Sequence, residues 1–341
     1  MHILDSKTVK SQLTMTMAID SIEQLLTLQA QHPEWIKCPE RLVIPTFTAS
    51  DKSSGSHLSM PSVLFDGHEE FAIVKLVTIC PDNPKRNLPT TTAVVSVSNN
   101  DTGEILAFMD GVYVTQVRTA ALSGIASKYL AKPDSQQVSV IGCGGMAYEQ
   151  LNAVLTVCPN IKKVMLWNRT VKGANTFKTQ FSEQYSEWSV TMEVCEDIAS
   201  AVKDADVINL ATRATEGLFE INQIKADVHI NAVGAYQPEM KEVSDSVIEA
   251  CSHVFIDDIA GGRHEAGDLI QADAAEGCSW TWEDLSGDLA DLVTKNMTID
   301  QDKKGITLFK SVGAASFDAA VALKVAQKAK DEGLGQLITW G

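Results

Sequence analysis

The segment Val138-Ser-Val-Ile-Gly-Cys-Gly-Gly-Met-Ala147 decides the fold class of this chain. Its first four residues form an apolar run that predicts a short buried strand, and the pattern from Ala147 onward predicts a helix. The loop between them has the spacing G-x-G-x-x-A. Gly142 permits a tight turn, Gly144 lets a phosphate approach the backbone, and Ala147 keeps the helix close to the strand. The segment therefore predicts a loop that binds a dinucleotide, with its phosphates at the helix N-terminus.

The alternation of strand and helix continues beyond this segment. Short apolar runs predict strands at residues 138–141, 164–167, 207–210, 229–233 and 254–256. Helical patterns separate them, at residues 147–157, 172–185, 196–202 and 241–250. Strands that alternate with helices in this way form a parallel sheet with helices on both faces. We therefore expect a Rossmann-type, doubly wound α/β domain in the central part of the chain.

The first third of the chain has a different pattern. A helix is predicted over residues 14–30, and strands are predicted at residues 41–45, 71–79 and 92–98. A polar loop at residues 50–56 and a hairpin-type turn at residues 99–103 connect such strands over short distances, which favours an antiparallel sheet. Further helices are expected at residues 118–131 and 316–330.

Bulk composition limits the classes of function. A chain of 341 residues exceeds what one hydrophobic core usually supports, so two domains are expected. The net charge of −16 disfavours binding to nucleic acid or to an anionic membrane. The seven scattered cysteines and seven histidines show no metal-ligand spacing, so we expect reduced thiols and no metal site. No signal-peptide pattern and no apolar stretch of bilayer length are visible, so a cytoplasmic protein is expected.

The end of the second predicted strand in the central domain bears on the choice of nucleotide. NAD enzymes usually place a carboxylate there to bond the ribose 2′-hydroxyl, whereas this chain has Asn168-Arg169-Thr170. Neutral Asn168 does not repel a 2′-phosphate, and Arg169 and Thr170 can bond one. We therefore expect NADP(H); if Arg169 is only a solvated surface residue, NAD(H) binds equally well. Thr212, which follows the third of these strands, is a further candidate for cofactor contact.

Three cations stand in or beside the apolar runs of the first third of the chain, or open the helix that follows. They are Arg41, Lys75 and Arg118. Lys75 lies in the middle of the predicted strand 71–79, where burial of an unpaired ammonium is costly. One explanation is an edge or outward position with the charge in water. The other is a clamp for a carboxylate, since two arginines can bind a carboxylate bidentately and fix its plane.

Several motifs together resemble those of one known family. They are Lys75-Leu-Val, Asn83-Pro, Leu88-Pro-Thr90-Thr, Thr102-Gly-Glu, Asp110-Gly, Arg118-Thr-Ala-Ala, the glycine loop, Val233-Gly, Glu265-Ala-Gly-Asp268 and Thr307-Leu-Phe-Lys-Ser-Val-Gly313. On these residues the chain resembles the ornithine cyclodeaminase/μ-crystallin family over nearly its whole length. The resemblance implies a homodimer. It also implies an α+β substrate-binding and dimerisation domain, residues 1–118 and 315–341, and a Rossmann NAD(P)-binding domain, residues 119–314.

The resemblance implies roles for individual residues as well. Arg41, Lys75 and Arg118 correspond to catalytic residues that hold the substrate carboxylate, and Thr90 lines the same pocket. Gly313 belongs to a turn that passes near the nicotinamide and the substrate. The expected cofactor contacts are Gly142, Gly144, Gly145, Met146, Ala147, Asn168, Arg169, Thr170, Thr212, Val233 and Ser311.

One position departs from the cyclodeaminase pattern. Family members that deaminate ornithine carry an aspartate after a Val-Gly-Gly segment, whereas this chain has Tyr236 there. A phenol with a pKa of about 10 serves poorly where a carboxylate must pair with an ammonium and move protons. Members without the aspartate include ketimine reductases. Tyr236 fits a small apolar ring beside the nicotinamide; simple packing in the core is the alternative role.

The resulting hypothesis is an NAD(P)H-dependent reductase of a cyclic imino acid. The substrates implied are Δ1-pyrroline-2-carboxylate and Δ1-piperideine-2-carboxylate, and the products are L-proline and L-pipecolate. Three alternatives stay open: an ornithine cyclodeaminase, an alanine-dehydrogenase-like enzyme, and a non-catalytic NADPH-dependent binder. Neither the ring size of the substrate nor the identity of the proton donor follows from the sequence. The hypothesis requires the cations of the first domain to gather opposite the nucleotide held by the second.

Overall fold

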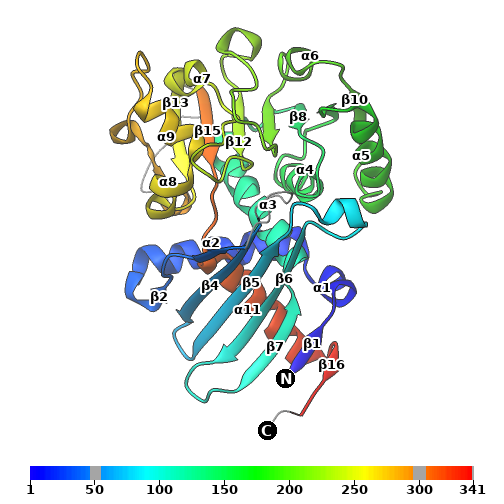
Figure 1. Ribbon diagram of the computed structural model, residues 1–341, viewed down its shortest axis with the longest axis vertical. Coiled ribbons are helices and arrows are strands. Elements are labelled where there is room, and N and C mark those ends of the chain that lie inside the picture. Colours follow the sequence, from blue (N-terminus) through cyan, green and yellow to red (C-terminus); the bar gives the residue numbers. More distant parts are fainter. Residues whose placement is uncertain (47–54, 295–304, 340–341) are drawn as a thin grey trace. The chain divides into compact units, whose positions relative to one another are not determined.

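The structure, a computed structural model, describes residues 1–46, 55–294 and 305–339. The chain divides into two compact units (Figure 1). Unit 1 comprises Met1–Arg118 and Ala314–Gly341, and unit 2 comprises Thr119–Gly313. The helix α3 (Gly111–Leu130) carries the chain from unit 1 into unit 2.

Unit 1 is built on a sheet whose strands run mostly antiparallel, as expected for strands joined by short turns. The order along the sheet is β16-β1-β7-β6-β5-β4-β2, and β3 also pairs with β4. Among the described pairs, β1 and β7 alone are parallel. The strands are β1 (His2–Leu4), β2 (Ile36–Lys37), β3 (Leu42–Pro45), β4 (Ser56–Phe65), β5 (Glu70–Ile79), β6 (Thr91–Asn99), β7 (Ile105–Asp110) and β16 (Gln336–Leu337).

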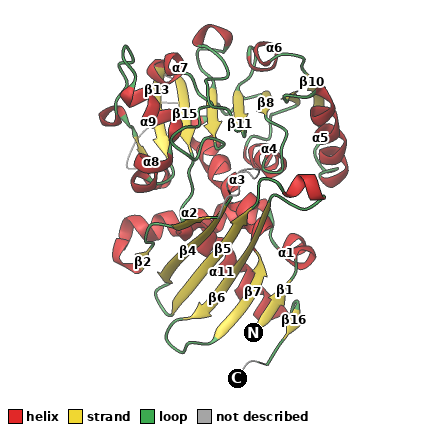
Figure 2. Cartoon of the chain, viewed as in Figure 1, coloured by secondary structure: helices red, strands yellow, loops and turns green. Residues whose placement is uncertain are grey.

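Helices cover one face of this sheet. Helix α11 (Ala315–Glu332) contacts β4, β5 and β6, and α2 (Met15–Gln31) packs against α11 (Figure 2). Phe71 and Val77 of β5 are buried on the covered face, because the side chains of a strand point alternately to its two faces. Lys75 lies on the same face of β5 as Phe71 and Val77, and its side chain therefore points inward as well. The alternative of an outward, solvated Lys75 is wrong.

Unit 2 contains a second sheet in which all described strand pairs are parallel. The order is β10-β9-β8-β11-β12-β15-β13-β14, so the chain proceeds in opposite directions from β8 and from β11. Such a reversal leaves a crevice at the carboxyl ends of the strands, where ligands bind. The strands are β8 (Gln137–Ile141), β9 (Lys163–Trp167), β10 (Thr191–Val194), β11 (Val207–Leu210), β12 (His229–Ala232), β13 (Cys251–Ile256), β14 (Gly287–Asp288) and β15 (Ile306–Lys310).

The remaining helices complete the two units and confirm the α/β fold class. Unit 1 also contains α1 (Ser6–Gln12), and 3-10 helices lie at Pro33–Trp35, Asn83–Arg86, Ile221–Gln223 and Trp282–Asp284. The helices of unit 2 after α3 are α4 (Ala147–Val157), α5 (Val171–Gln184), α6 (Ile198–Val202), α7 (Asp245–Ala250), α8 (Ile259–Glu265), α9 (Gly267–Ala274) and α10 (Leu289–Val293). Within the ranges that the structure describes, no helix combines the length and the apolar character needed to cross a membrane.

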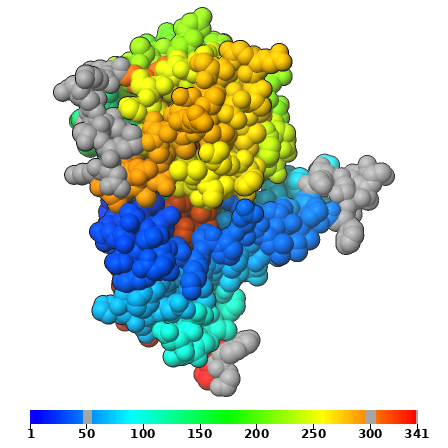
Figure 3. All heavy atoms as spheres, turned by 90° about the vertical axis from the view of Figure 1, so that its left-hand side faces the viewer, coloured from blue at the N-terminus to red at the C-terminus, as the bar shows by residue number. Residues whose placement is uncertain are grey.

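Helices α8 and α9 lie partly on the surface of unit 2. Figure 3 shows this surface in yellow and orange, and Arg263 and Asp273 are exposed on it. The start of α9 faces inward instead, since Asp268 and Leu269 are buried completely. An aspartate at such depth needs a specific partner.

Two expectations from the sequence need correction. The helix predicted from residue 118 begins earlier, at Gly111, because the Asp110 carboxylate accepts the N–H of Tyr113 at 2.9 Å and satisfies a donor of the first turn. Of the loop predicted at residues 50–56, residues 50–54 lie outside the described residues. Ser56 begins β4, which was not predicted as a strand.

Candidate active site

Unit 1 brings Lys75 and Arg118 together in a buried ion cluster. Asp318, from α11, accepts a hydrogen bond from Lys75 Nζ at 2.7 Å on one oxygen and from Arg118 Nε at 3.0 Å on the other. The exposed fractions are 2% for Lys75, 5% for Arg118 and 1% for Asp318. The strand β5 and the helices α3 and α11 therefore supply one side chain each to the same cluster.

Burial tunes the acid–base behaviour of this cluster. It lowers the pKa of Lys75 to about 8; Asp318 opposes that shift, and the charges of Arg118 and Arg41 add to it. Burial also acts to raise the pKa of Asp318, but Arg118 and Lys75 outweigh it and hold that pKa below its usual value. Lys75 is thus mostly protonated at neutral pH and yet able to release its proton. A group with such a pKa is suited to general acid catalysis.

Arg41 adds a further positive charge to this neighbourhood. It lies directly before β3, is half-buried, and acts electrostatically on Lys75. Within the buried cluster itself, Lys75 and Arg118 against the carboxylate of Asp318 leave a net charge of +1. Because carboxylates bind best to guanidinium and ammonium donors, this group of residues suits a small anionic ligand.

Thr90 is placed differently from the cations. It lies immediately before β6 and is half-buried, and its carbonyl accepts the N–H of Cys80 at 2.7 Å. Its predicted place in a substrate pocket remains a prediction.

Asp318 was not predicted as a site residue from the sequence. The residue lies in the alanine-rich stretch of α11, where Ala315, Ala319 and Ala322 are buried. A carboxylate among buried alanines needs a buried cation as its partner. That requirement, applied to Lys75 in its apolar strand, is the signal that could have connected the two residues.

The glycine loop of unit 2 has the geometry that a pyrophosphate requires. Gly142 has φ 93°, in the left-handed region, and a Cβ there would lie 2.7 Å from the carbonyl oxygen of Ala211. Gly144 and Gly145 are exposed, and a Cβ on Gly144 would meet no atom within 4 Å. Met146 is half-buried and ends the loop, and α4 begins at Ala147. The backbone at Gly144 is therefore open to a phosphate at a helix N-terminus.

The predicted nucleotide-selecting residues follow β9. Asn168 Oδ1 accepts the N–H of Cys143 at 3.2 Å, and its Nδ2 donates to the Thr170 carbonyl at 3.3 Å. Asn168 therefore ties the glycine loop to the turn before α5. Arg169 and Thr170 are exposed, and Thr170 Oγ1 caps α5 by accepting the N–H of Gly173 at 3.2 Å.

The other predicted residues of unit 2 follow strands of the same parallel sheet. Thr212 follows β11, and Val233 and Tyr236 follow β12. Thr212 is half-buried, while Val233 and Tyr236 lie in the segment that leaves the buried end of β12. Ser311 and Gly313 follow β15. Because parallel strands end at one edge of the sheet, these residues lie at the same edge as the glycine loop.

A buried aspartate that the sequence analysis missed holds the turn after β15. Asp257 follows β13 and accepts hydrogen bonds from Ser311 Oγ at 2.6 Å, from the Val312 N–H at 3.1 Å and from the Gly313 N–H at 2.8 Å. Gly313 has φ 78°, which a glycine adopts without strain. A carboxylate that accepts several backbone N–H groups fixes a tight turn, so Asp257 determines the shape of the segment 311–313.

The class that this fold and these residues define is an oxidoreductase with a Rossmann-type unit and a second, α+β unit. The model of the ornithine cyclodeaminase/mu-crystallin family matches residues 2–333, so the chain belongs to this family. The resemblance inferred from the sequence is thereby confirmed.

Relatives and solved structures agree with this assignment. A Delta(1)-pyrroline-2-carboxylate reductase of Bacillus cereus is 34% identical over 301 residues, 88% of this chain and 90% of the relative. Ketimine reductase mu-crystallin of Macropus fuliginosus is 31% identical over 285 residues, 83% and 82% of the two chains. The structure of Thermococcus litoralis Delta(1)-pyrroline-2-carboxylate reductase in complex with NADH and L-proline matches with a TM-score of 0.89 at 31% identity, covering 99% of this chain and 100% of that one. An archaeal alanine dehydrogenase dimer with bound NAD has a TM-score of 0.86 at 28% identity, covering 100% and 99%.

Proposed function

We propose that this protein is an NADPH-dependent ketimine reductase. Its substrates are Δ1-pyrroline-2-carboxylate, Δ1-piperideine-2-carboxylate or both, and its products are L-proline and L-pipecolate. The observation that carries the proposal is the buried cluster of Lys75, Arg118 and Asp318 with Arg41 beside it, whose excess of positive charge suits a small carboxylate. Relatives at 31–34% identity that are named for the same class of reaction support it.

The arginines are proposed to hold the substrate. Asp318 binds Arg118 through Nε, which fixes the guanidinium and leaves its Nη end as the part that binds the carboxylate. Arg41 provides the second guanidinium, and Thr90 lines the pocket. Two planar, charge-assisted contacts fix the orientation of the carboxylate and thereby of the neighbouring C=N bond.

Lys75 is the proposed proton source. Reduction adds a hydride to the C2 atom of the C=N bond and a proton to the nitrogen, so that the imine becomes a secondary amine. A bound reduced nicotinamide supplies the hydride and leaves oxidised. The ammonium of Lys75 donates the proton directly or through a water molecule, and the resulting neutral amine regains its proton from solvent. Protonation of the imine makes C2 more electrophilic, so a donor with a pKa of about 8 accelerates the transfer near neutral pH.

The residues of unit 2 fit a nicotinamide dinucleotide, and NADPH is the proposed form. The N–H groups of the segment from Gly142 to Ala147 would hold the pyrophosphate, and Arg169 and Thr170 would bind a 2′-phosphate at the start of α5. Asn168 carries no charge to repel that phosphate. The nicotinamide side would contact Thr212, Val233 and Ser311, with Gly313 and Tyr236 beside the substrate. NADH is the weaker alternative.

Tyr236 separates this proposal from cyclodeamination. It occupies the position after Ala235 at which the family's cyclodeaminases have a carboxylate. A phenol does not pair with the side-chain ammonium of ornithine as a carboxylate does. The proposed substrate therefore lacks a second amino group.

We further propose that the protein acts as a homodimer in the cytoplasm. The side chains of β3 are exposed although they are apolar: Leu42 is 57%, Val43 50% and Ile44 50% exposed. An apolar strand of this kind is typical of a surface that a second subunit covers. All seven cysteines are described and free, which fits a reducing compartment.

An assay of the purified full-length protein tests the reaction. NADPH oxidation is followed in separate incubations with each cyclic imine, and the product is identified by chiral chromatography. We expect turnover of at least one imine to the L-amino acid. Oxidation of NADH with pyruvate and ammonia but not with the imines would favour the dehydrogenase alternative, and ammonia release from ornithine would favour a cyclodeaminase. Absence of turnover with both imines rejects the proposal.

A further inference from the structure

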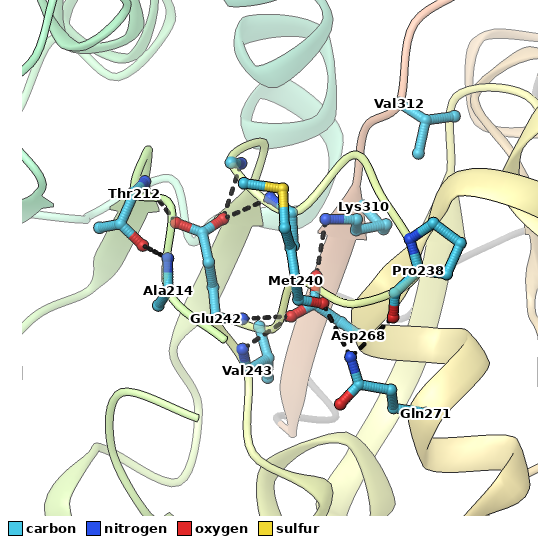
Figure 4. Close-up of polar contacts among 12 residues, drawn as sticks. Thr212, Ala214, Pro238, Met240, Glu242, Val243, Asp268, Gln271, Lys310 and Val312 are labelled. Carbon is cyan, nitrogen blue, oxygen red and sulfur yellow. Dashed lines mark hydrogen bonds and ion pairs between the residues drawn. The ribbon is translucent and has the colours of Figure 1, made fainter. Parts of the chain in front are cut away.

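A second buried ion cluster lies in unit 2, and its residues are not among the proposed cofactor and substrate contacts (Figure 4). It consists of Glu242, Asp268 and Lys310, each of which is 0% exposed. Glu242 lies between β12 and α7, Asp268 is in the first turn of α9, and Lys310 is the last residue of β15. Charges at this depth are costly unless they are paired and hydrogen-bonded. Their contacts therefore show what they hold in place.

Glu242 binds the backbone of two neighbouring loops. Its Oε1 accepts the N–H of Thr212 at 2.5 Å, and its Oε2 accepts the N–H groups of Gly234 at 2.6 Å and Ala235 at 3.2 Å. Thr212 follows β11 and Gly234 follows the adjacent strand β12. One carboxylate therefore fastens the loops that carry the proposed cofactor and substrate contacts Thr212, Val233 and Tyr236.

The two loops approach each other closely at this point. A Cβ added to Gly234 would lie 2.2 Å from the carbonyl oxygen of Thr212 and 2.5 Å from Glu242 Oε1. No side chain fits there without a shift of the backbone. The close approach places three backbone N–H groups around a single carboxylate, an arrangement that favours its ionised form.

Asp268 and Lys310 hold Glu242 itself. Asp268 Oδ1 accepts the N–H of Glu242 at 2.5 Å and the N–H of Val243 at 2.9 Å. Its other oxygen, Oδ2, lies 2.6 Å from Lys310 Nζ, as an ion pair whose angles are not those of a directed hydrogen bond. The start of α9 is tightly packed here, since a Cβ on Gly267 would lie 2.1 Å from the carbonyl oxygen of Met240.

The cluster has one negative charge more than it has positive charges. Burial raises the pKa of Glu242 to about 7, with Lys310 opposing the shift and Asp268 adding to it. The nearby Lys241 is paired with Asp245 at 2.5 Å. A protonated Glu242 has lost its charge and carries an O–H on one oxygen, which accepts more weakly from the N–H groups that face it. Loss of the charge therefore loosens the hold of Glu242 on one of the two loops.

We propose that Glu242 is a positioning residue whose ionised carboxylate holds the loops after β11 and β12 in the conformation that receives the nicotinamide nucleotide. Lys310, fixed by Asp268, supplies the positive charge that keeps Glu242 ionised. This inference rests on the proposed function, because it assigns the two loops to the nucleotide site. It adds a group that touches neither cofactor nor substrate and acts through the backbone.

Hydrogen exchange on the full-length protein without nucleotide tests the holding role directly. We expect Glu242→Gln to lower by about tenfold the protection of either the Thr212 amide or the Gly234 and Ala235 amides, since an NH₂ group replaces one of the two accepting oxygens. Glu239→Gln, which removes the same charge from an exposed residue of the same segment, is the matched control and should leave them unchanged. Unchanged protection in a folded Glu242→Gln variant overturns the proposal.

Nucleotide affinity provides the second readout. If only the ionised form of Glu242 holds the loops, the affinity of the wild type for NADPH should fall by about tenfold as the pH is lowered from about 8 to about 6. Glu242→Gln should bind weakly at both pH values, without this dependence. Asp268→Asn should move the midpoint of the wild-type dependence to lower pH, because Asp268 acts to raise the pKa of Glu242.

If a variant fails to fold, the wild-type protein still tests the role of Glu242. In that case the protection of the same three amides is measured across the pH series, and a protection that does not change with pH overturns the proposal. Failure of the proposed function gives a different result. It would appear as absence of imine turnover by the wild type, while the exchange of these amides would still report on Glu242.

Discussion

Lys75 and Asp318 are 243 positions apart in sequence, yet the Lys75 ammonium lies 2.7 Å from an Asp318 carboxylate oxygen, and both side chains are buried. The pair joins the central strand β5 to the helix that covers it. Removing one partner of such a pair leaves an uncompensated buried charge, which costs more than the intact pair contributes.

Replacement of Asp318 should therefore affect both stability and catalysis. We expect Asp318→Asn to lower the free energy of unfolding by about 3–5 kcal/mol. Because Asp318 acts to raise the pKa of Lys75, its loss should also lower that pKa below about 8 and move the alkaline limb of the activity profile to lower pH. Denaturant titration and a pH series of kcat/KM measure the two effects. An unchanged limb in a folded variant would contradict the proposed coupling.

Replacement of Lys75 tests the proton source. We expect Lys75→Met to reduce kcat by about a hundredfold or more, as removal of a general acid does. The wild-type activity should fall as pH rises through about 8, because burial lowers the pKa of Lys75 to that value and the neutral amine cannot donate. The variant should lose this limb. Lys330→Met, at an exposed position of α11, is the control and should retain it.

Replacement of Arg41 tests substrate binding. We expect Arg41→Met to raise the KM for the imine by about tenfold to a hundredfold, the effect of losing a hydrogen bond to a charged group. The Kd for NADPH should not change, and this split distinguishes a lost substrate contact from general damage. Arg86→Met removes an exposed arginine of the same unit and should have no effect on KM. A KM for Arg41→Met equal to that of the wild type would remove Arg41 from the site.

Replacement of Asn168 tests nucleotide preference. Asn168→Asp keeps the oxygen that accepts the Cys143 N–H but adds a negative charge and loses the donor to Thr170. We expect kcat/KM with NADPH to fall by at least about tenfold while that with NADH holds or rises, since a carboxylate repels a 2′-phosphate and binds a 2′-hydroxyl. Asn175→Asp, exposed on α5, serves as the control. Equal losses with both nucleotides would show that Asn168 has only a structural role.

The exposed apolar strand β3 predicts the oligomeric state. We expect the wild type to sediment as a dimer and Leu42→Ser/Ile44→Ser to shift the equilibrium toward monomer, because both leucine and isoleucine are about half exposed in the single chain. Leu337→Ser, which removes a leucine that is 72% exposed at a different strand, is the control. A wild-type monomer at micromolar concentration would contradict the proposed dimer.

Much of unit 2 was predictable because its signals are local. The alternation of short apolar strands with helices identifies the parallel sheet, and the glycine spacing after residue 141 identifies the loop at its switch point. β15 escaped prediction, since Thr307 and Lys310 interrupt the apolar run by which a buried strand is recognised. The role of Glu242 was equally hidden, because it depends on backbone N–H groups that only the folded loops bring together.

The candidate site of unit 1 was predictable only in part. Arg41, Lys75 and Arg118 stand out as cations among apolar residues, and family resemblance assigns them a common role. The carboxylate that joins Lys75 to Arg118 comes from the other end of the chain, and no local pattern connects residue 75 with residue 318. A long-range ion pair is a property of the tertiary structure, not of any segment.

The composition of unit 1 from both ends of the chain has a consequence for synthesis on the ribosome. Residues 119–313 form a continuous unit that is complete before α11 has been made, whereas the sheet of unit 1 lacks its covering helix until residues 315–332 emerge. A nascent chain thus carries Lys75 and Arg118 without their counter-ion throughout the translation of unit 2. Unit 1, whose first residues are translated before unit 2, is therefore the last unit to be completed.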